Sequence, residues 1–178
     1  GEISRFYGYV ADGIFQNQTE VNAHTDEYGT VIQPNAQPGD IRFKDLNHDG
    51  KLDDNDKTFI GNAFPDLMVG INARLAWKNI DFAANFYGTI GNDVYNTTKG
   101  RYSGVSGENV YAGTYNASWH GEGTSYDLPR LSYNDANQNW TRVSSFYVED
   151  GSYLRCKQLQ IGYTLPKKWT KKISLRLS

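Results

Sequence analysis

Hydrophobic and polar residues alternate along residues 67–77, with the period of two that is typical of a β-strand. The even positions are small or polar apart from Met68, whereas the odd positions hold Leu67, Val69, Ile71, Ala73, Leu75 and Trp77. After a tight turn at Lys78 and Asn79, the same face continues with Ile80, Phe82, Ala84 and Phe86. The sequence therefore predicts a hairpin of long strands with one apolar face and one polar face.

The length of these strands separates two kinds of β-protein. Transmembrane β-barrels use strands of roughly 9–11 residues, with apolar side chains toward lipid and polar ones toward the lumen. Strands of soluble proteins also alternate, but they are usually about 5–6 residues long. The pattern therefore favours an all-β chain that forms a portion of an antiparallel transmembrane β-barrel with long extracellular loops.

The alternation returns after residue 146, with a change of parity inside it. Leu154 and Cys156 occupy even positions, whereas the next apolar residues are Leu159, Ile161, Tyr163 and Leu165. Two residues of one strand that face a single partner residue would restore a common face, so we predict a β-bulge near Lys157 and Gln158. Pro166 ends this strand, and a further one begins with Ile173, Leu175 and Leu177.

The turn between these last two strands is basic and contains Lys167, Lys168, Lys171 and Lys172. It suits a membrane–water boundary and a solubilising turn equally well. The final residues stop in the middle of an alternating pattern, and Gly1–Ile3 is neither an initiator nor a signal peptide. We therefore expect the chain to be part of a longer protein.

Residues 89–145 show almost no periodicity, although aromatic residues are scattered through them: Tyr102, Tyr111, Tyr115, Trp119, Tyr126, Tyr133 and Trp140. Loops of this length are uncommon in compact domains and are usually functional or disordered. Two interpretations remain open. The aromatic side chains contact a sugar or a partner protein, or they pack the loop against itself.

The segment 45–56 has the oxygen spacing of an EF-hand calcium loop, with Gly50 at the sharp turn. The predicted ligands are the side chains of Asp45, Asn47, Asp49, Asp53 and Asp56 and the carbonyl of Lys51. Asp53 would bind directly or through water, and Asp56 is shorter than the usual glutamate. The flanks read as β segments, which favours a Ca²⁺ clamp that stabilises a loop. The alternative is an Asp- and Asn-rich turn that needs no metal.

Composition excludes several functions. The chain has 178 residues, 13 of them Tyr and 18 Gly, which favours β structure with many turns. A net charge of -2 shows no basic excess, so we expect no nucleic-acid partner. The single Cys156 allows no internal disulfide. His24, His48 and His120 have no nucleophile motif nearby, so no catalytic residue and no enzyme is predicted.

The tracts 38–50 with 60–62, 91–96, and 148–155 running into 161–166 resemble those of SusC/RagA-type TonB-linked outer-membrane proteins. This resemblance implies a plugged barrel of about 22 strands in the outer membrane lipid of Bacteroidetes. Such a barrel imports glycans, peptides or other large nutrients. A SusD-like lipoprotein covers its mouth, and TonB acts on a plug that lies outside this chain.

On this resemblance, residues 1–178 are a portion of the C-terminal half of the barrel. A strand end and an extracellular loop with the calcium segment come first (1–64), and a transmembrane hairpin follows (65–88). A long extracellular loop (89–145) and the strands with the basic turn (146–178) complete the chain. The alternative is a secreted, soluble, calcium-stabilised β-domain that binds carbohydrate or protein. Dockerin loops are similar, but dockerins carry two copies and helices.

Overall fold

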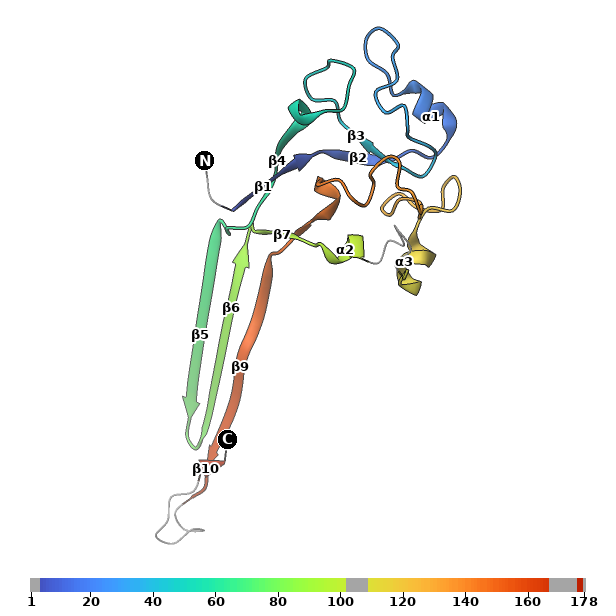
Figure 1. The fold of residues 1–178 in the computed structure, drawn as a ribbon. Helices are drawn as coiled ribbons and strands as arrows, with labels where there is room; N and C mark the ends of the chain where they lie inside the picture. Colours follow the sequence, from blue (N-terminus) through green and yellow to red (C-terminus); the bar gives the residue numbers. More distant parts are fainter. Residues whose placement is uncertain (1–3, 102–108, 167–175, 178) are drawn as a thin grey trace. The chain divides into compact units, whose positions relative to one another are not determined.

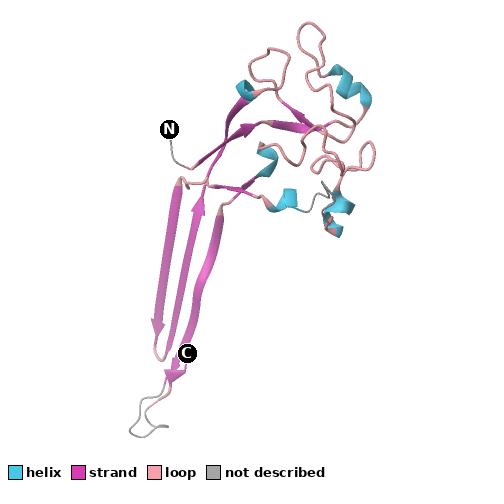
Figure 2. Ribbon diagram, viewed as in Figure 1, coloured by secondary structure: helices cyan, strands magenta, loops and turns pink. Residues whose placement is uncertain are grey.

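The computed structural model describes residues 4–101, 109–166, 176 and 177, which form two compact units (Figure 1). We call them the strand unit, from Phe64–Asp93 and Asp150–Ser178, and the loop unit, from Gly1–Ala63 and Val94–Glu149. The long strands belong to the first unit, and the short helices belong to the second (Figure 2). Both units are built from segments that are not contiguous in sequence.

The strand unit is a four-stranded sheet in the order β10-β9-β6-β5. Its strands are β5 (Leu67–Trp77), β6 (Ile80–Ile90), β9 (Tyr153–Thr164) and β10 (Arg176–Leu177). β5 and β6 pair without interruption from Leu67 opposite Ile90 to Trp77 opposite Ile80. Lys78 takes a positive φ of 55° in the connecting turn. The predicted hairpin is confirmed.

The predicted bulge is also present, between β6 and β9. Phe86 pairs with Cys156, whereas the neighbouring Asn85 pairs with Gln158, so Lys157 is the extra residue. Directly opposed residues of antiparallel strands project to the same face. The extra residue therefore places Leu154, before the bulge, and Leu159, after it, on one face of the sheet.

That face is apolar over its whole area. Its members are the odd residues of β5 and the residues opposite them: Leu67, Val69, Ile71, Ala73, Leu75, Trp77, Ile80, Phe82, Ala84, Phe86, Gly88, Ile90, Leu154, Cys156, Leu159, Ile161 and Tyr163. Leu75 is 69% exposed and Leu159 63%. A large exposed apolar surface of this kind requires an apolar environment or partner.

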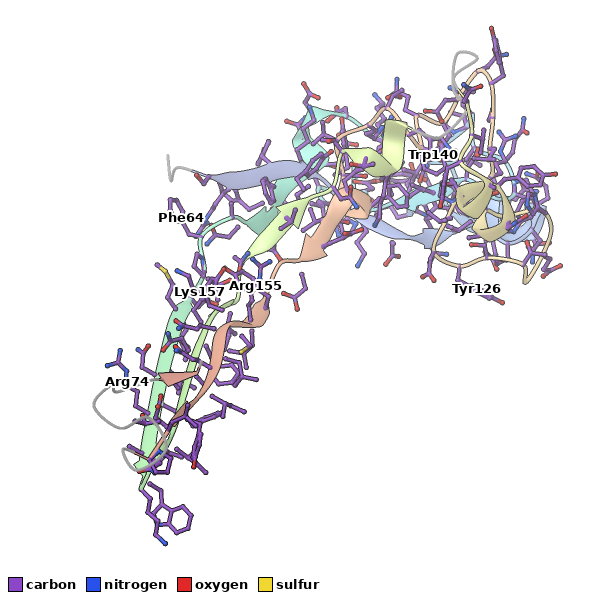
Figure 3. The ribbon with its side chains drawn as sticks, turned by 90° about the horizontal axis from the view of Figure 1, so that it is seen from below. Phe64, Arg74, Tyr126, Trp140, Arg155 and Lys157 are labelled. Atoms are coloured by element: carbon purple, nitrogen blue, oxygen red, sulfur yellow. The ribbon has the colours of Figure 1, made fainter. Side chains whose placement is uncertain are left out.

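The opposite face is polar. Asn72, Asn85 and Gln158 stand opposite one another across three strands, and the Asn85 amide donates to Gln158 Oε1 at 3.0 Å. Arg155 donates to the Tyr87 hydroxyl at 3.3 Å, and Arg74 lies further along the same face (Figure 3). The two faces therefore match the apolar and polar faces predicted from the sequence.

The loop unit contains three pairs of short antiparallel strands. β1 (Arg5–Tyr9) pairs with β4 (Lys57–Asn62), β2 (Ala11–Ile14) with β3 (Ile41–Phe43), and β7 (Asp93–Tyr95) with β8 (Val148–Asp150). Tyr9, Ile41 and Phe43 form one buried cluster, and Phe15, Val21 and Ala36 form another. These small clusters are the apolar core of the loop unit.

Short helices connect these strands: α1 (Gln18–Ala23), α2 (Thr98–Arg101), α3 (Ala112–Ala117) and the 3₁₀ turns η1 (Asp54–Asp56) and η3 (Ser145–Tyr147). α1 lies in a stretch that reads as a polar loop in the sequence. Asn17 caps this helix by accepting the N–H of Glu20 at 3.0 Å, and the Glu20 carboxylate accepts the N–H of Gln16 at 2.8 Å. The first bond is an N-cap, which stabilises a short helix start, and the second ties the residue before the cap to the first turn.

None of the described helices is long and apolar enough to cross a membrane. The predicted basic turn, with Lys167, Lys168, Lys171 and Lys172, lies outside the described residues, as do Ile173, Leu175 and Tyr102.

Candidate functional site in the loop unit

The segment 45–56, which we call the acidic loop, is held by its own carboxylates. Asp45 is 9% exposed, and its two oxygens accept the N–H groups of His48 at 2.7 Å and Gly50 at 2.8 Å. Gly50 has a φ of 79°, and a Cβ there would lie 2.3 Å from a carboxylate oxygen of Asp26. The turn at Gly50 therefore requires glycine.

At the C-terminal end of the acidic loop, a second carboxylate also accepts backbone N–H groups. Asp56 is fully buried, and its oxygens accept the N–H groups of Leu46 and Asp53, each at 2.8 Å. Asp53 in turn accepts the N–H of Asn55 at 2.8 Å, which completes a capping box on η1. Asp56 thus ties the beginning of the loop to its end.

Asn47 and Asp49 bond to each other in the middle of the loop. The Asn47 amide donates to Asp49 Oδ2 at 2.9 Å, and Asp49 Oδ1 accepts the N–H of Lys51 at 3.0 Å. These hydrogen bonds offset part of the mutual repulsion of the carboxylates.

The predicted ligands fit a hard cation in chemistry, but their carboxylates do not form a group that is placed to hold one. All of them offer oxygen, as Ca²⁺ prefers, and a carboxylate oxygen that accepts one hydrogen bond keeps a second lone pair. Within the described ranges, however, no three Asp, Glu, His or Cys side chains are placed to hold a metal ion. Cation binding would therefore require Asp45, Asp49 and Asp56 to turn toward a common centre.

A buried ion pair holds residues 130–140 against the strand pair β2–β3. Asp40 has no exposed surface, and Arg130 Nε donates to its Oδ1 at 2.6 Å. The same oxygen accepts the Asn139 amide at 2.8 Å, and Oδ2 accepts the N–H of Gln37 at 2.8 Å. The carboxylate is therefore both paired and hydrogen-bonded, as a buried charge requires.

Side-chain amides extend this network along β3. They bond to the backbone N–H and C=O groups that a neighbouring strand would otherwise pair with. The N–H of Ile41 donates to Asn139 Oδ1 at 2.8 Å, and the N–H of Phe43 donates to Gln33 Oε1 at 2.7 Å. The Ile41 carbonyl accepts from both Gln33 and Asn137, at 3.0 and 2.9 Å. Sequence reasoning missed these amides, because single Asn and Gln residues give no periodic signal.

Six of the aromatic residues described in the stretch 109–145 fall into two groups. Trp140 is buried and donates to the Arg130 carbonyl at 3.3 Å, and Trp119 donates to Gln16 Oε1 at 3.2 Å. Trp119 thus joins this stretch to the first part of the loop unit, whereas the bond of Trp140 lies within the stretch. Four other aromatic residues remain exposed, namely Tyr111, Tyr115, Tyr126 and Tyr133.

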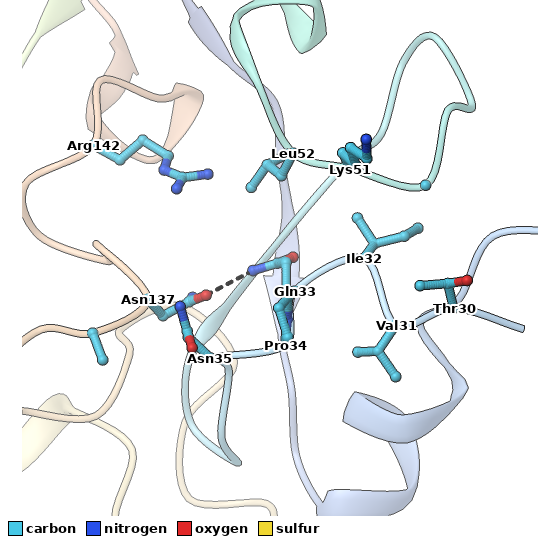
Figure 4. A pocket seen from close by; sticks show the side chains of 12 residues that line it. Thr30, Val31, Ile32, Gln33, Pro34, Asn35, Lys51, Leu52, Asn137 and Arg142 are labelled. Atoms are coloured by element: carbon cyan, nitrogen blue, oxygen red, sulfur yellow. Dashed lines mark hydrogen bonds between the residues drawn. The ribbon is translucent and has the colours of Figure 1, made fainter.

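A pocket of about 390 Å³ opens beside the acidic loop, with Lys51 and Arg142 among the residues that line it (Figure 4). The guanidinium of Arg142 lies 4.7 Å from the ring centre of Tyr9 and 5.0 Å from that of Phe43. Its Nε and Nη2 donate to Gln138 Oε1 at 3.3 and 3.1 Å. Burial lowers the pKa of Arg142, but a guanidinium remains charged at neutral pH.

No family model matches the sequence. The curated proteins that resemble it are TonB-dependent receptors. The chain is 32% identical to TonB-dependent receptor P3 of Formosa agariphila over 174 residues, 98% of this chain and 16% of that protein. It is 24% identical to TonB-dependent receptor SusC of Bacteroides thetaiotaomicron over 95% of this chain and 17% of that protein. The chain thus spans about one sixth of the length of these curated relatives.

A solved structure shares the fold. The RagAB peptide importer in its open-open state matches 97% of this chain and 17% of the compared chain, with a TM-score of 0.63. The sequence identity is 18%, so this similarity is one of fold alone.

Proposed function

The chain belongs to the TonB-dependent receptors of the SusC and RagA type, and from this premise we propose that it is part of an outer-membrane nutrient importer. The resemblance seen in the three sequence tracts is confirmed, as is the all-β fold class. The proposed cargo is a glycan, a peptide or a similarly large nutrient, and the proposed location is the outer membrane of a member of the Bacteroidetes. No catalytic role is proposed.

The observation that carries this proposal is the two-sided sheet of the strand unit. β5, β6 and β9 have 11, 11 and 12 residues, which is enough for a tilted strand to cross a bilayer. Every paired position on one face is apolar or glycine. In a soluble carbohydrate-binding domain this apolar face would be exposed to water. Because such exposure is unfavourable, the sheet argues against that alternative.

We extend the proposal to two partners. A SusD-like lipoprotein would cover the extracellular mouth, and TonB would act through regions outside this chain. The family supports this assignment, and the exposed tyrosines of the loop unit are suited to contact with cargo or a partner protein, because tyrosine is enriched at interfaces.

The acidic loop is proposed to be a calcium clamp that stiffens the loop unit. Asp45, Asn47, Asp49, Asp53 and Asp56 would supply side-chain oxygens, and Lys51 its carbonyl. In the full-length protein, Asp49→Ala should lower Ca²⁺ binding in calorimetry and make residues 45–56 more sensitive to protease. If bound calcium and protease resistance are both unchanged, the loop is a metal-free turn.

Uptake measurements test the importer itself. A strain that lacks the full-length protein should fail to accumulate a fluorescent oligosaccharide or peptide that the wild type takes up, and loss of TonB should have the same effect. Normal growth on every glycan and peptide source, together with unchanged uptake, would contradict the proposal.

A further inference from the structure

We propose that the pocket beside Arg142 binds a free carboxylate attached to a compact apolar group, such as the C-terminal residue of a peptide. Its wall is largely aliphatic and comprises Val31, Ile32, Pro34, Leu52 and Ala136. Its volume of about 390 Å³ lies at the small end of the range for ligand sites, which suits one residue rather than an extended chain. This site goes beyond the proposed import function.

The charges at the pocket select an anion. Two cations, Lys51 and Arg142, line it, and none of the described lining residues is acidic. Asp56 and Asp135 act on Arg142 electrostatically, but they form no ion pair with it among the described residues. Both carboxylates accept backbone N–H groups instead. The positive charge at the pocket is therefore not neutralised by a contact.

Arg142 is fixed in place and has an unused donor. Tyr9 and Phe43 hold the plane of its guanidinium, and Gln138 accepts from two of its nitrogens. The third nitrogen, Nη1, is buried and has no acceptor among the described residues. A buried donor without a partner in the chain is unusual, and a ligand oxygen or a water that reaches it would satisfy it. Figure 4 shows the guanidinium directed toward the space next to Leu52.

Two of the three side-chain amides that line the pocket are engaged inside the protein. Gln33 donates to the Ile41 carbonyl and to Asn137, and Asn137 donates to Ile41 and Asn139. Their N–H donors are therefore engaged inside the protein, and they shape the pocket without offering hydrogen bonds to a sugar hydroxyl. Beside Asn35 and Thr30, the two cations line the pocket, and they favour a carboxylate because charge-assisted hydrogen bonds are the stronger kind.

A matched pair of probes isolates the carboxylate. In the full-length protein in detergent, calorimetry should show that N-acetyl-leucine binds at least about tenfold more tightly than N-acetyl-leucinamide. Arg142→Met should remove this preference. The control is Arg42→Met, since Arg42 also lies near an aromatic ring, 5.9 Å from that of Phe15, but does not line the pocket. It should bind both probes as the wild type does.

A second variant covers the case in which Arg142→Met does not fold. Lys51 is exposed, so Lys51→Met should leave the fold intact and still reduce the preference for the acid over the amide. Equal affinity for the two probes, or a preference that survives both substitutions, would overturn the proposal. Binding is measured without transport, so this failure would leave the importer proposal standing.

Discussion

At the scale of single residues, Asp40 anchors residues 130–140 through Arg130 and Asn139. Asp40→Ala would leave Arg130 and the Asn139 amide without their acceptor. Removing one partner of a buried pair costs about 3–5 kcal/mol. Amide hydrogen exchange in the full-length protein should show a loss of this size in the protection of residues 130–140.

The ion pairs of Asp12 supply the control for this substitution. They join Asp12 to Arg42 and Lys44 at 3.5 and 3.3 Å, and all three side chains are substantially exposed. Exposed pairs contribute about 0–1 kcal/mol, so Asp12→Ala should change protection little. A similar effect for both substitutions would show that the Asp40 network does not hold the segment.

His24 gives the loop unit a dependence on pH. Burial lowers the pKa of His24 below its ordinary value of 6.5, and the ring bonds to the Phe43 carbonyl at 3.1 Å. The unfolded chain therefore takes up the proton more readily. The stabilisation by neutral His24 is complete above pH 6.5 and is lost as the pH falls from there through the lower folded pKa.

Limited proteolysis of residues 24–40 measures this effect. Cleavage should be faster at about pH 5.5 than at about pH 7.5 in the wild type, because histidine titrates in this window. The increase should be smaller in His24→Gln, which does not titrate. The same pH dependence in both proteins would assign it to another group.

At the scale of elements, the bulge at Lys157 sets which face each half of β9 presents. Inserting one alanine after Arg155 should shift the first half of β9 by one residue, and such a shift moves every side chain in that half to the other face. If the first half moves, Arg155 faces lipid, which costs up to about 2–4 kcal/mol at the bilayer midplane and less near an interface. The folded fraction of the full-length barrel, measured by heat-modifiable gel migration, should therefore fall.

Lys157→Ala keeps the number of residues and serves as the control. It removes the ammonium group, which lies 6.0 Å from the Tyr87 ring, but leaves the extra residue in place. Folding of this variant should match that of the wild type. Normal folding of the insertion variant would mean that the register of the first half does not matter for folding.

The hairpin and the bulge could be predicted from the sequence, because the alternation of apolar and polar residues indicates which face of the sheet each side chain occupies. The register then follows from the two-residue turn at Lys78 and Asn79, since a tight turn fixes the pairing of both strands. The packing of residues 89–145 could not be read in this way. It depends on isolated contacts such as that of Asn139 with Ile41, 98 positions away in the sequence.

The acidic loop could be predicted only in part from the sequence. The spacing of Asp45, Asp49 and Asp56 marked a loop with a defined turn, and Gly50 has the positive φ that the turn requires. The backbone hydrogen bonds of these carboxylates depend on side-chain rotamers, which spacing does not specify. The sequence therefore predicts ligand chemistry, whereas the bonds within the loop are seen only in the structure.

At the scale of the whole molecule, the strand unit needs surroundings that its described residues do not supply. β5 forms one edge of the sheet, and its outer side has no partner strand among the described residues. An open edge beside an exposed apolar face is prone to aggregation in water. In a closed barrel within a membrane, neighbouring strands cover the edge and lipid covers the face.

Spin labels along β5 test this account most directly. Labels placed singly at Val69, Ile71 and Leu75 in the full-length protein should be accessible to lipid-soluble oxygen, because these residues belong to the apolar face. Labels at Gly70, Asn72 and Arg74, on the polar face, should instead be accessible to a water-soluble quencher. If the odd positions are shielded from both reagents, the apolar face is covered by protein and the strands do not span a membrane.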